Sequence, residues 1–148
     1  MAITKTTLYE SLREENDQIR LLRLLPARSM DDPIQVALVT CSLQSAPEYE
    51  AISYYWGDPS NTADIFVRNA MQLRYWWKWK RPWQRKAVTV SLHGALQRLR
   101  LATTRRPEWA DALCIDQGNV QEWNQQVQMM GSIYRSARRV NAWVGPEV

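Results

Sequence analysis

One short apolar run in the second half of the chain constrains the fold most. It extends from Trp109 to Gln117, begins apolar, ends polar, and is bounded by Pro107 and Gly118. Short apolar runs between turn residues are typical of buried strands, so we expect a strand here. Asp111 interrupts the run, and because a buried carboxylate is costly without partners, we expect it to be hydrogen-bonded.

Strand and helix patterns alternate on both sides of this run. Helices are expected at residues 92–101 and 120–137, and strands at residues 49–56 and 140–144. Strands that alternate with helices indicate an α/β fold, with an open, mostly parallel sheet and helices on its faces.

The N-terminal part of the chain follows a different pattern. Residues 1–18 are polar and charged, and we expect them to form an arm. Residues 19–25 and 34–43 have the composition of two strands, separated by a turn region with two acids and a proline. We expect these strands to pair as an N-terminal antiparallel hairpin at the edge of the sheet.

The second helix carries the clearest amphipathic pattern in the chain. Its apolar residues are spaced three and four apart, and they are Val120, Trp123, Val127, Met130, Tyr134 and Ala137. Such a stripe is expected to pack on the core. Asn119 is expected to cap this helix, with Glu122 completing a capping box, and Ser91 is expected to cap the first helix.

The net charge of +4 comes from one segment. Residues 74–87 contain six basic residues and no acid, and without those six the acids outnumber the bases. Four of the eight tryptophans lie in the same segment. Three interpretations are open: a basic aromatic loop that touches membrane or nucleic acid, a hairpin that packs on the body, or an inert insertion. The rest of the domain makes no strong case for nucleic acid.

Length and composition narrow the class further. The 148 residues suffice for one ordinary domain. The chain has no apolar run of about 18 residues and no apolar signal region, so neither a transmembrane helix nor secretion is expected. Cys41 and Cys114 fall in expected buried strands, and we expect both to be reduced in a cytoplasmic protein.

Polar residues follow two of the expected strands, at the positions where ligands bind in open α/β sheets. The candidates are Trp56, Gly57 and Asp58 after one strand, Asp116 and Gln117 after another, and Glu122 on the following helix. A tryptophan ring can stack on a base, and carboxylates can accept hydrogen bonds from ribose hydroxyls. The alternative is that Trp56 covers the sheet edge and the carboxylates cap turns and helices. Glu122 is a weak catalytic candidate because capping already explains it.

Other catalytic chemistries find little support. The single histidine, His93, lies early in a helix and is expected to be an exposed helix residue. The sequence contains no metal-ligand spacing and no glycine-rich phosphate loop. A nucleophile pair of Cys114 and His93 is disfavoured because the cysteine falls inside an apolar strand.

Three ordered stretches resemble the fungal heterokaryon incompatibility (HET) domain. Residues 49–58 are similar to its opening motif, Tyr-x-Ala-Leu-Ser-Tyr-x-Trp-Gly, and residues 109–117 to Trp-Ile-Asp-Ala-Ile-Cys-Ile-Asn-Gln. The third stretch runs from residue 126 to 145, and the resemblance covers about residues 9–148. The sequence departs from the family pattern at three positions. Ala110 stands where a bulky aliphatic residue is usual, Asp116 where asparagine is typical, and Trp123 where a basic residue is common. The basic segment lies where the family has a short hairpin, which favours the inert insertion.

The resemblance implies a role in fungal non-self recognition, in which such domains trigger growth arrest and cell death. It also implies a Toll/interleukin-1 receptor (TIR) or flavodoxin-like fold. Some TIR domains cleave NAD with a glutamate, and others act only by assembling. The family motif that ends in Gln-Glu would follow Val148, so we expect residues 19–148 to be a partial domain that does not cleave NAD alone. NAD is the candidate substrate, and protein partners are expected through homotypic or allelic contacts.

Overall fold

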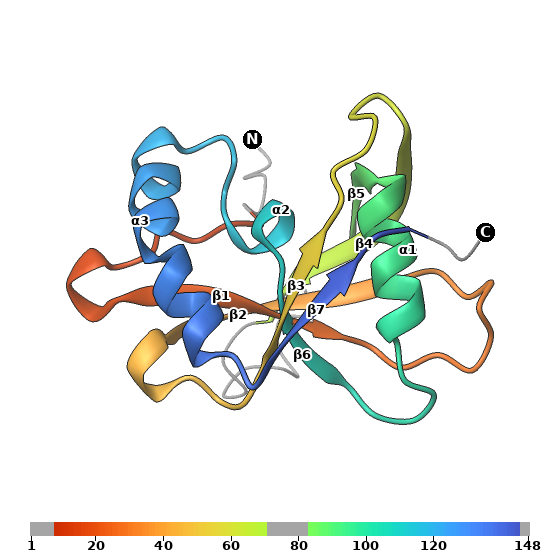
Figure 1. The fold of residues 1–148 in the computed structure, drawn as a ribbon, viewed down its shortest axis with the longest axis horizontal. Coiled ribbons are helices and arrows are strands. Elements are labelled where there is room, and N and C mark those ends of the chain that lie inside the picture. Colours follow the sequence, from red (N-terminus) through yellow and green to blue (C-terminus); the bar gives the residue numbers. More distant parts are fainter. Residues whose placement is uncertain (1–7, 71–82, 146–148) are drawn as a thin grey trace, which may run out of the picture.

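The computed structural model describes residues 8–70 and 83–145, which form a seven-stranded sheet with three α-helices (Figure 1). In chain order the elements are η1 (Glu14–Asn16), β1 (Gln18–Leu24), β2 (Gln35–Ser42), η2 (Leu43–Ser45), β3 (Glu50–Tyr54), β4 (Thr62–Asn69), β5 (Gln84–Thr89), α1 (Val90–Leu99), β6 (Arg106–Trp109), α2 (Asp111–Cys114), α3 (Val120–Ser136) and β7 (Arg139–Trp143).

The strand order is β5-β4-β2-β1-β6-β3-β7, and the sheet is mixed. The pairs β2–β4, β3–β6 and β3–β7 are parallel, whereas β1–β2, β1–β6 and β4–β5 are antiparallel. The expected α/β class is confirmed, but the expectation of a mostly parallel sheet is wrong. β1 and β2 pair antiparallel in the middle of the sheet rather than at its edge, and β1 is therefore buried along nearly its whole length.

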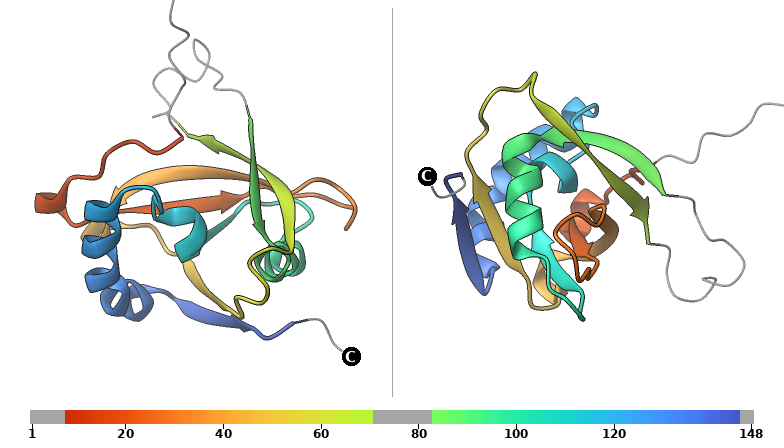
Figure 2. Two further views of the ribbon diagram at one scale, coloured as in Figure 1. Left: turned by 90° about the horizontal axis from the view of Figure 1, so that it is seen from above. Right: turned by 90° about the vertical axis from the view of Figure 1, so that its right-hand side faces the viewer.

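The sheet curves around α1, as Figure 2 shows. The helix contacts β3, β4 and β5, although β3 lies near one end of the strand order and β5 at the other. Leu92, Ala95 and Leu96, spaced three and one apart on one face of α1, are completely buried against this sheet. The curvature brings the ends of β3 and β7 beside the first turns of α1, which positions the candidate site.

The run from Trp109 to Gln117 is not a strand. β6 ends at Trp109, and α2 follows as a single helical turn, with the Ala110 carbonyl accepting hydrogen bonds from the N–H groups of Leu113 (3.2 Å) and Cys114 (2.8 Å). A short buried apolar run does not distinguish a strand from a buried helical turn. Asp111 is half-buried and hydrogen-bonded as expected, but on α2, where Oδ1 accepts from the Tyr54 hydroxyl at 3.0 Å.

The helix caps were only partly predicted. Asn119 caps α3 through its side chain, which accepts from the Glu122 N–H at 3.1 Å. The Glu122 carboxylate does not close a capping box, because it binds Arg20 and the Asp116 N–H instead. α1 is capped by Thr89 rather than by Ser91, since β5 runs directly into the helix.

The first half of the α3 apolar stripe faces outward, so the expectation that it packs on the core is wrong there. Val120, Trp123 and Val127 are exposed, whereas Met130, Tyr134 and Ala137 pack partly against the core. The buried residues of α3 are Glu122, Gln126 and Ile133. Glu122 pairs with Arg20, and Gln126 Nε2 donates to the Gln18 carbonyl at 2.9 Å. These polar partners set the rotation of the helix.

The C-terminal end of the basic segment belongs to the sheet. Residues 84–87 belong to β5 and pair with residues 64–67 of β4, so they are part of the sheet. The guanidinium of Arg68 lies 4.5 Å from the centroid of the Trp83 ring. The rest of the segment expected to be inserted, residues 74–82, lies outside the described residues.

The membrane-spanning potential of the helices and the state of the two cysteines can be compared with the sequence analysis. Within the described ranges, no helix is long and apolar enough to cross a membrane. Cys41 and Cys114 are both free thiols, but only Cys41 lies in a strand, because Cys114 ends α2.

Candidate functional site

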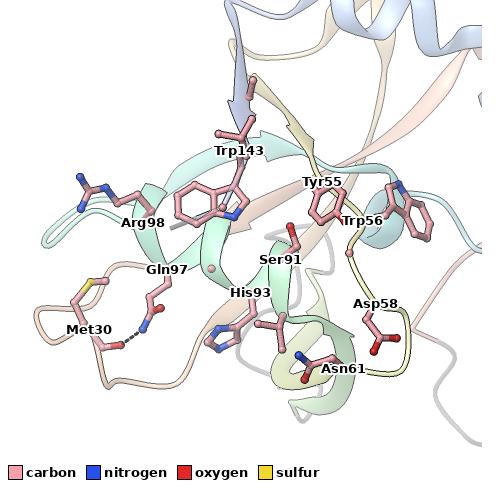
Figure 3. A pocket seen from close by; sticks show the side chains of 16 residues that line it. Met30, Tyr55, Trp56, Asp58, Asn61, Ser91, His93, Gln97, Arg98 and Trp143 are labelled. Atoms are coloured by element: carbon pink, nitrogen blue, oxygen red, sulfur yellow. Dashed lines mark hydrogen bonds between the residues drawn. The ribbon is translucent and has the colours of Figure 1, made fainter. Parts of the chain in front are cut away.

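A cavity of about 910 Å³ lies at the carboxyl ends of β3 and β7, beside α1 (Figure 3). The loop after β3 contributes Tyr55, Trp56, Gly57 and Asp58, and β7 contributes Trp143. This is where parallel strands of an α/β sheet typically present a ligand site, because side chains diverge beyond the last hydrogen bond of the ladder.

Apolar side chains dominate the rim of this cavity. Five of them are largely exposed, namely Met30, Tyr55, Trp56, Val90 and Val144. Scattered exposed apolar residues are ordinary, but five around one hollow indicate a surface that is covered by something else in use. The Trp56 ring also stacks on Tyr54 with a centroid separation of 6.1 Å, which orients one wall.

Two glycines permit this geometry. Gly57 has φ of +66°, a left-handed conformation that lets the chain turn sharply after β3. A Cβ atom at Gly94 would lie only 3.2 Å from Cζ2 of Trp143, so the absence of a side chain lets the indole lie directly against α1. The floor of the cavity therefore depends on Gly94 and Trp143 together.

Polar groups from α1 point toward the same space (Figure 3). The buried hydroxyl oxygen of Ser91 has no hydrogen-bond partner among the described residues. Burial, and then the charge of Arg100, lower the pKa of His93, so its imidazole is neutral near pH 7 and offers one donor and one acceptor. Gln97 Nε2 is engaged by the Met30 carbonyl at 2.8 Å.

Asp58 is the one carboxylate among the described residues that line this cavity. Its Oδ1 accepts hydrogen bonds from the hydroxyl (2.7 Å) and the N–H (2.9 Å) of Ser60. These bonds lower the pKa of Asp58, so it is ionised at neutral pH. The site can therefore bind a planar, partly apolar molecule that carries hydroxyl or amide groups.

The six candidate residues fall into two separate places. Trp56, Gly57 and Asp58 line the cavity, whereas Asp116, Gln117 and Glu122 do not. Asp116 Oδ1 accepts from the Gly118 N–H at 3.1 Å, and Gln117 Nε2 donates to the Asp111 carbonyl at 3.1 Å. Both therefore act in the local turn that joins α2 to α3.

Glu122 is half of a buried ion pair. Its two carboxylate oxygens accept hydrogen bonds from Arg20 Nη1 (2.8 Å) and Nη2 (2.6 Å), and Oε2 also accepts from the Asp116 N–H at 2.6 Å. Arg20 donates further to the carbonyls of Cys114 and Glu10. The pair thus joins the N-terminal arm, β1, α2 and α3, and the carboxylate has little capacity left for a substrate.

Sequence reasoning did not identify most of the residues that line the cavity, among them Ser91, His93 and Trp143. His93 is half-buried rather than exposed. Ser91 was interpreted as a helix cap and His93 as an exposed helix residue, because the closing of the sheet around α1 has no local signature in the sequence. Trp143 lies at the end of β7, and Trp56 lies two residues after the end of β3. This shared position at a strand end was the signal from which Trp143 could have been predicted as a site residue.

Cys114 and His93 do not form a nucleophilic pair. Cys114 is fully buried, and burial raises the pKa of its thiol to about 12. In the described part of the chain, no three His, Cys, Asp or Glu side chains are grouped to hold a metal ion.

A second ionic cluster lies at the opposite end of β3. Glu50 Oε2 accepts from Arg106 Nε (2.8 Å) and Nη2 (2.6 Å). Arg106 Nε also lies 2.9 Å from Oε1 of the fully buried Glu108, but it is directed at Glu50, so Glu108 gains charge proximity without an aligned hydrogen bond. Burial therefore raises the pKa of Glu108 to about 8. At Glu50 burial also acts to raise the pKa, but Arg106, Asn141 and Arg139 together outweigh it and lower the pKa.

The fold and the cavity define an α/β domain with a ligand-sized hollow at its strand ends. Residues 49–148 match the family described as heterokaryon incompatibility protein (HET). Heterokaryon incompatibility protein 6, OR allele, of Neurospora crassa is 35% identical over 147 residues, which are 95% of this chain and 21% of that protein. The chain belongs to the heterokaryon incompatibility family, as the motif resemblance indicated. It spans about a fifth of the length of this curated relative. No solved structure shows significant similarity to it.

Proposed function

We propose that this chain acts in fungal non-self recognition, as a heterokaryon incompatibility domain that arrests growth and kills the cell when it is activated. Family membership and the similarity to an incompatibility protein support the biological role. The single observation that carries the molecular part is the cavity, with exposed aromatic side chains gathered at the ends of β3 and β7. Activation in this proposal depends on a ligand held there, and on protein partners of the homotypic or allelic kind.

The proposed ligand class is a nucleotide such as NAD. The Trp56 ring offers an exposed face for a base, since stacking on an aromatic ring stabilises a base without reading its sequence. The ionised Asp58 is suited to accept hydrogen bonds from ribose hydroxyls. Ser91 and the neutral His93 add a hydroxyl and an imidazole for the remaining polar groups.

NAD cleavage is the enzymatic alternative, because the motif resemblance implies a fold related to TIR domains, some of which cleave NAD. Cleaving the glycosidic bond needs a carboxylate positioned against a developing oxocarbenium ion. Asp58 is on a short side chain held by Ser60, and Glu122 is engaged by Arg20. We therefore propose that this chain binds NAD without turning it over at a useful rate.

A cellular experiment tests the proposed role. Expressed in a filamentous fungus, the chain is expected to reduce growth and viability, and Trp56→Ala and Asp58→Asn are expected to relieve this effect. Both positions are exposed, so each variant should stay folded, with a loss of about 1 kcal/mol for the ring contact with Tyr54 or the hydrogen bonds from Ser60. Gln117→Ala is the matched control, because Gln117 is exposed and lies outside the cavity. Equal toxicity of all variants would reject the cavity as the active element.

A binding experiment separates the two molecular alternatives. Calorimetry with NAD is expected to show binding that Trp56→Ala weakens and Gln117→Ala leaves unchanged. Nicotinamide release is expected to stay at the background rate. Robust nicotinamide release by the wild-type chain would overturn this proposal, and its loss in Asp58→Asn but not in Gln117→Ala would place the catalytic carboxylate in the cavity.

A further inference from the structure

Three apolar side chains are exposed on the outer side of α3, beside uncharged amide side chains such as Asn124 and Gln128. Val120, Trp123 and Val127 are 72%, 43% and 38% exposed. Between Val120 and Tyr134 the single charged residue is Glu122, and it is buried against Arg20. Charged residues normally cover exposed helix faces, so four turns without an exposed charge indicate a surface that another molecule covers. Figure 1 shows α3 at one side of the domain, well away from α1.

The spacing of these residues favours a helix as the covering element. Apolar residues three and four apart form the seam that packs against another helix, with each large side chain inserted into a hole between four residues of the facing helix. The one exposed cation of α3, Arg135, lies in its last turn, where it donates to the Ser132 hydroxyl, so the stretch from Val120 to Tyr134 offers neither a basic cluster for a phosphate surface nor an exposed acid for a basic partner. A partner recognised by opposite charge is therefore disfavoured.

We propose that the covering element is α3 of a second copy of this chain, packed antiparallel about Val127. A two-fold interface must be self-complementary, and an uncharged face meets its copy without repulsion of like charges. In an antiparallel pair centred on Val127, a residue before Val127 in one copy faces the residue equally far after Val127 in the other. Trp123 of one copy therefore faces the hole bounded by Val127, Met130, Gly131 and Tyr134 of the other.

Gly131 makes that hole deep enough for an indole. It is exposed in the middle of α3, and a Cβ atom built on it would meet nothing within 4 Å. A glycine inside an exposed helix costs about 1 kcal/mol relative to alanine, so its position calls for a reason. The flexible thioether of Met130 suits the edge of an aromatic ring. This contact is remote from the cavity and does not depend on the proposed function.

Sedimentation equilibrium and light scattering of the full chain test the proposal. The wild-type chain is expected to dimerise reversibly at up to about 200 µM, a range that reveals weak contacts. Gly131→Leu fills the hole while improving helix propensity, so the monomer stays folded and the dissociation constant rises about tenfold or more. Trp123→Ala is expected to weaken the dimer similarly.

A charge-swap experiment tests the two-fold geometry. Val127 faces its own copy at the axis, so Val127→Glu and Val127→Lys are each expected to give monomers, and an equimolar mixture is expected to restore dimers. Leu101→Glu is the matched control, because Leu101 is 39% exposed but lies outside α3, and it should dimerise as the wild type does. A wild-type chain that stays monomeric, or a dimer insensitive to Gly131→Leu and the Val127 variants, would overturn the proposal.

Discussion

Replacing Glu122 by glutamine tests the buried ion pair that holds the domain together. Arg20 and Glu122 are 2% and 5% exposed, and two guanidinium nitrogens of Arg20 donate to the carboxylate. The amide introduced by Glu122→Gln would keep one acceptor oxygen but would present its NH₂ group to one of the two Arg20 nitrogens in either orientation. Arg20 would then have no opposite charge beside it and would keep one amide oxygen, two backbone carbonyls and the ring of Tyr9, which lies 4.8 Å from the guanidinium carbon.

The expected loss of stability is large. Removing one partner of a buried pair costs about 3–5 kcal/mol, because the remaining charge stays desolvated. A domain of this size is stable by about 5–15 kcal/mol, so the change removes a substantial fraction of the total. With a urea slope of about 2 kcal/mol/M, the unfolding midpoint should fall by about 2 M.

Urea unfolding followed by circular dichroism measures this effect. Glu48→Gln is the control, since the pair between Glu48 and Arg138 is exposed and should contribute within about 1 kcal/mol. The double change Arg20→Met with Glu122→Leu is expected to recover much of the loss, because no unpaired charge is left buried. A loss below about 1 kcal/mol for Glu122→Gln would refute the reasoning, since the pair would then be hydrated or replaceable.

Three other features of the structure lead to measurable expectations. Asp111→Ala should cost about 1–3 kcal/mol in urea unfolding, because the Tyr54 hydroxyl loses its acceptor, and a loss near zero would contradict the hydrogen bond. The pKa of Glu108 is raised to about 8 in the folded protein from an ordinary value of 4.5. The folded state therefore holds a proton that the unfolded chain releases, so this contribution to stability is complete below about pH 4.5 and is lost as pH rises through about 8. Glu108→Gln should flatten the decline of the urea midpoint over that interval, and an unchanged pH profile would show that Glu108 is ionised throughout. Extending a deletion of residues 74–82 to 74–87 removes four of the six β5 residues and should lower the thermal midpoint by a further 3 °C or more, about 1 kcal/mol; equal midpoints would mean that β5 is dispensable.

Local patterns predicted most elements because each has its own periodicity. The strands at 19–25, 34–43 and 140–144 and the helices at 92–101 and 120–137 were found within about two residues of their observed bounds. The run at 109–117 failed because a buried helical turn and a buried strand are equally apolar. The sheet order also escaped prediction, since β6 inserts between β1 and β3 through contacts far apart in the sequence.

For the candidate site too, the sequence predicted what depends on local position and not what depends on contacts between distant residues. The position of Trp56, Gly57 and Asp58 just after a strand was visible in the sequence, and the three residues do line the cavity. Asp116 and Gln117 carry the same local signal but follow a helical turn, so they point elsewhere. The approach of α1 to the end of β7 depends on the curvature of the whole sheet.

The sequence by itself determined that α3 is a helix and that it begins after Asn119. It also determined that the chain belongs to the heterokaryon incompatibility family. Only the tertiary structure decided which side of α3 faces inward. A stripe of valine, tryptophan and methionine predicts an inward face from its apolar spacing alone. In the folded chain the inward side of α3 carries Glu122, which pairs with the buried Arg20, and Val120, Trp123 and Val127 are exposed. A buried arginine without a carboxylate partner would stay desolvated and unpaired, so the rotation of the helix keeps this pair together. That outcome depends on a residue about a hundred positions earlier in the chain, which no local pattern contains.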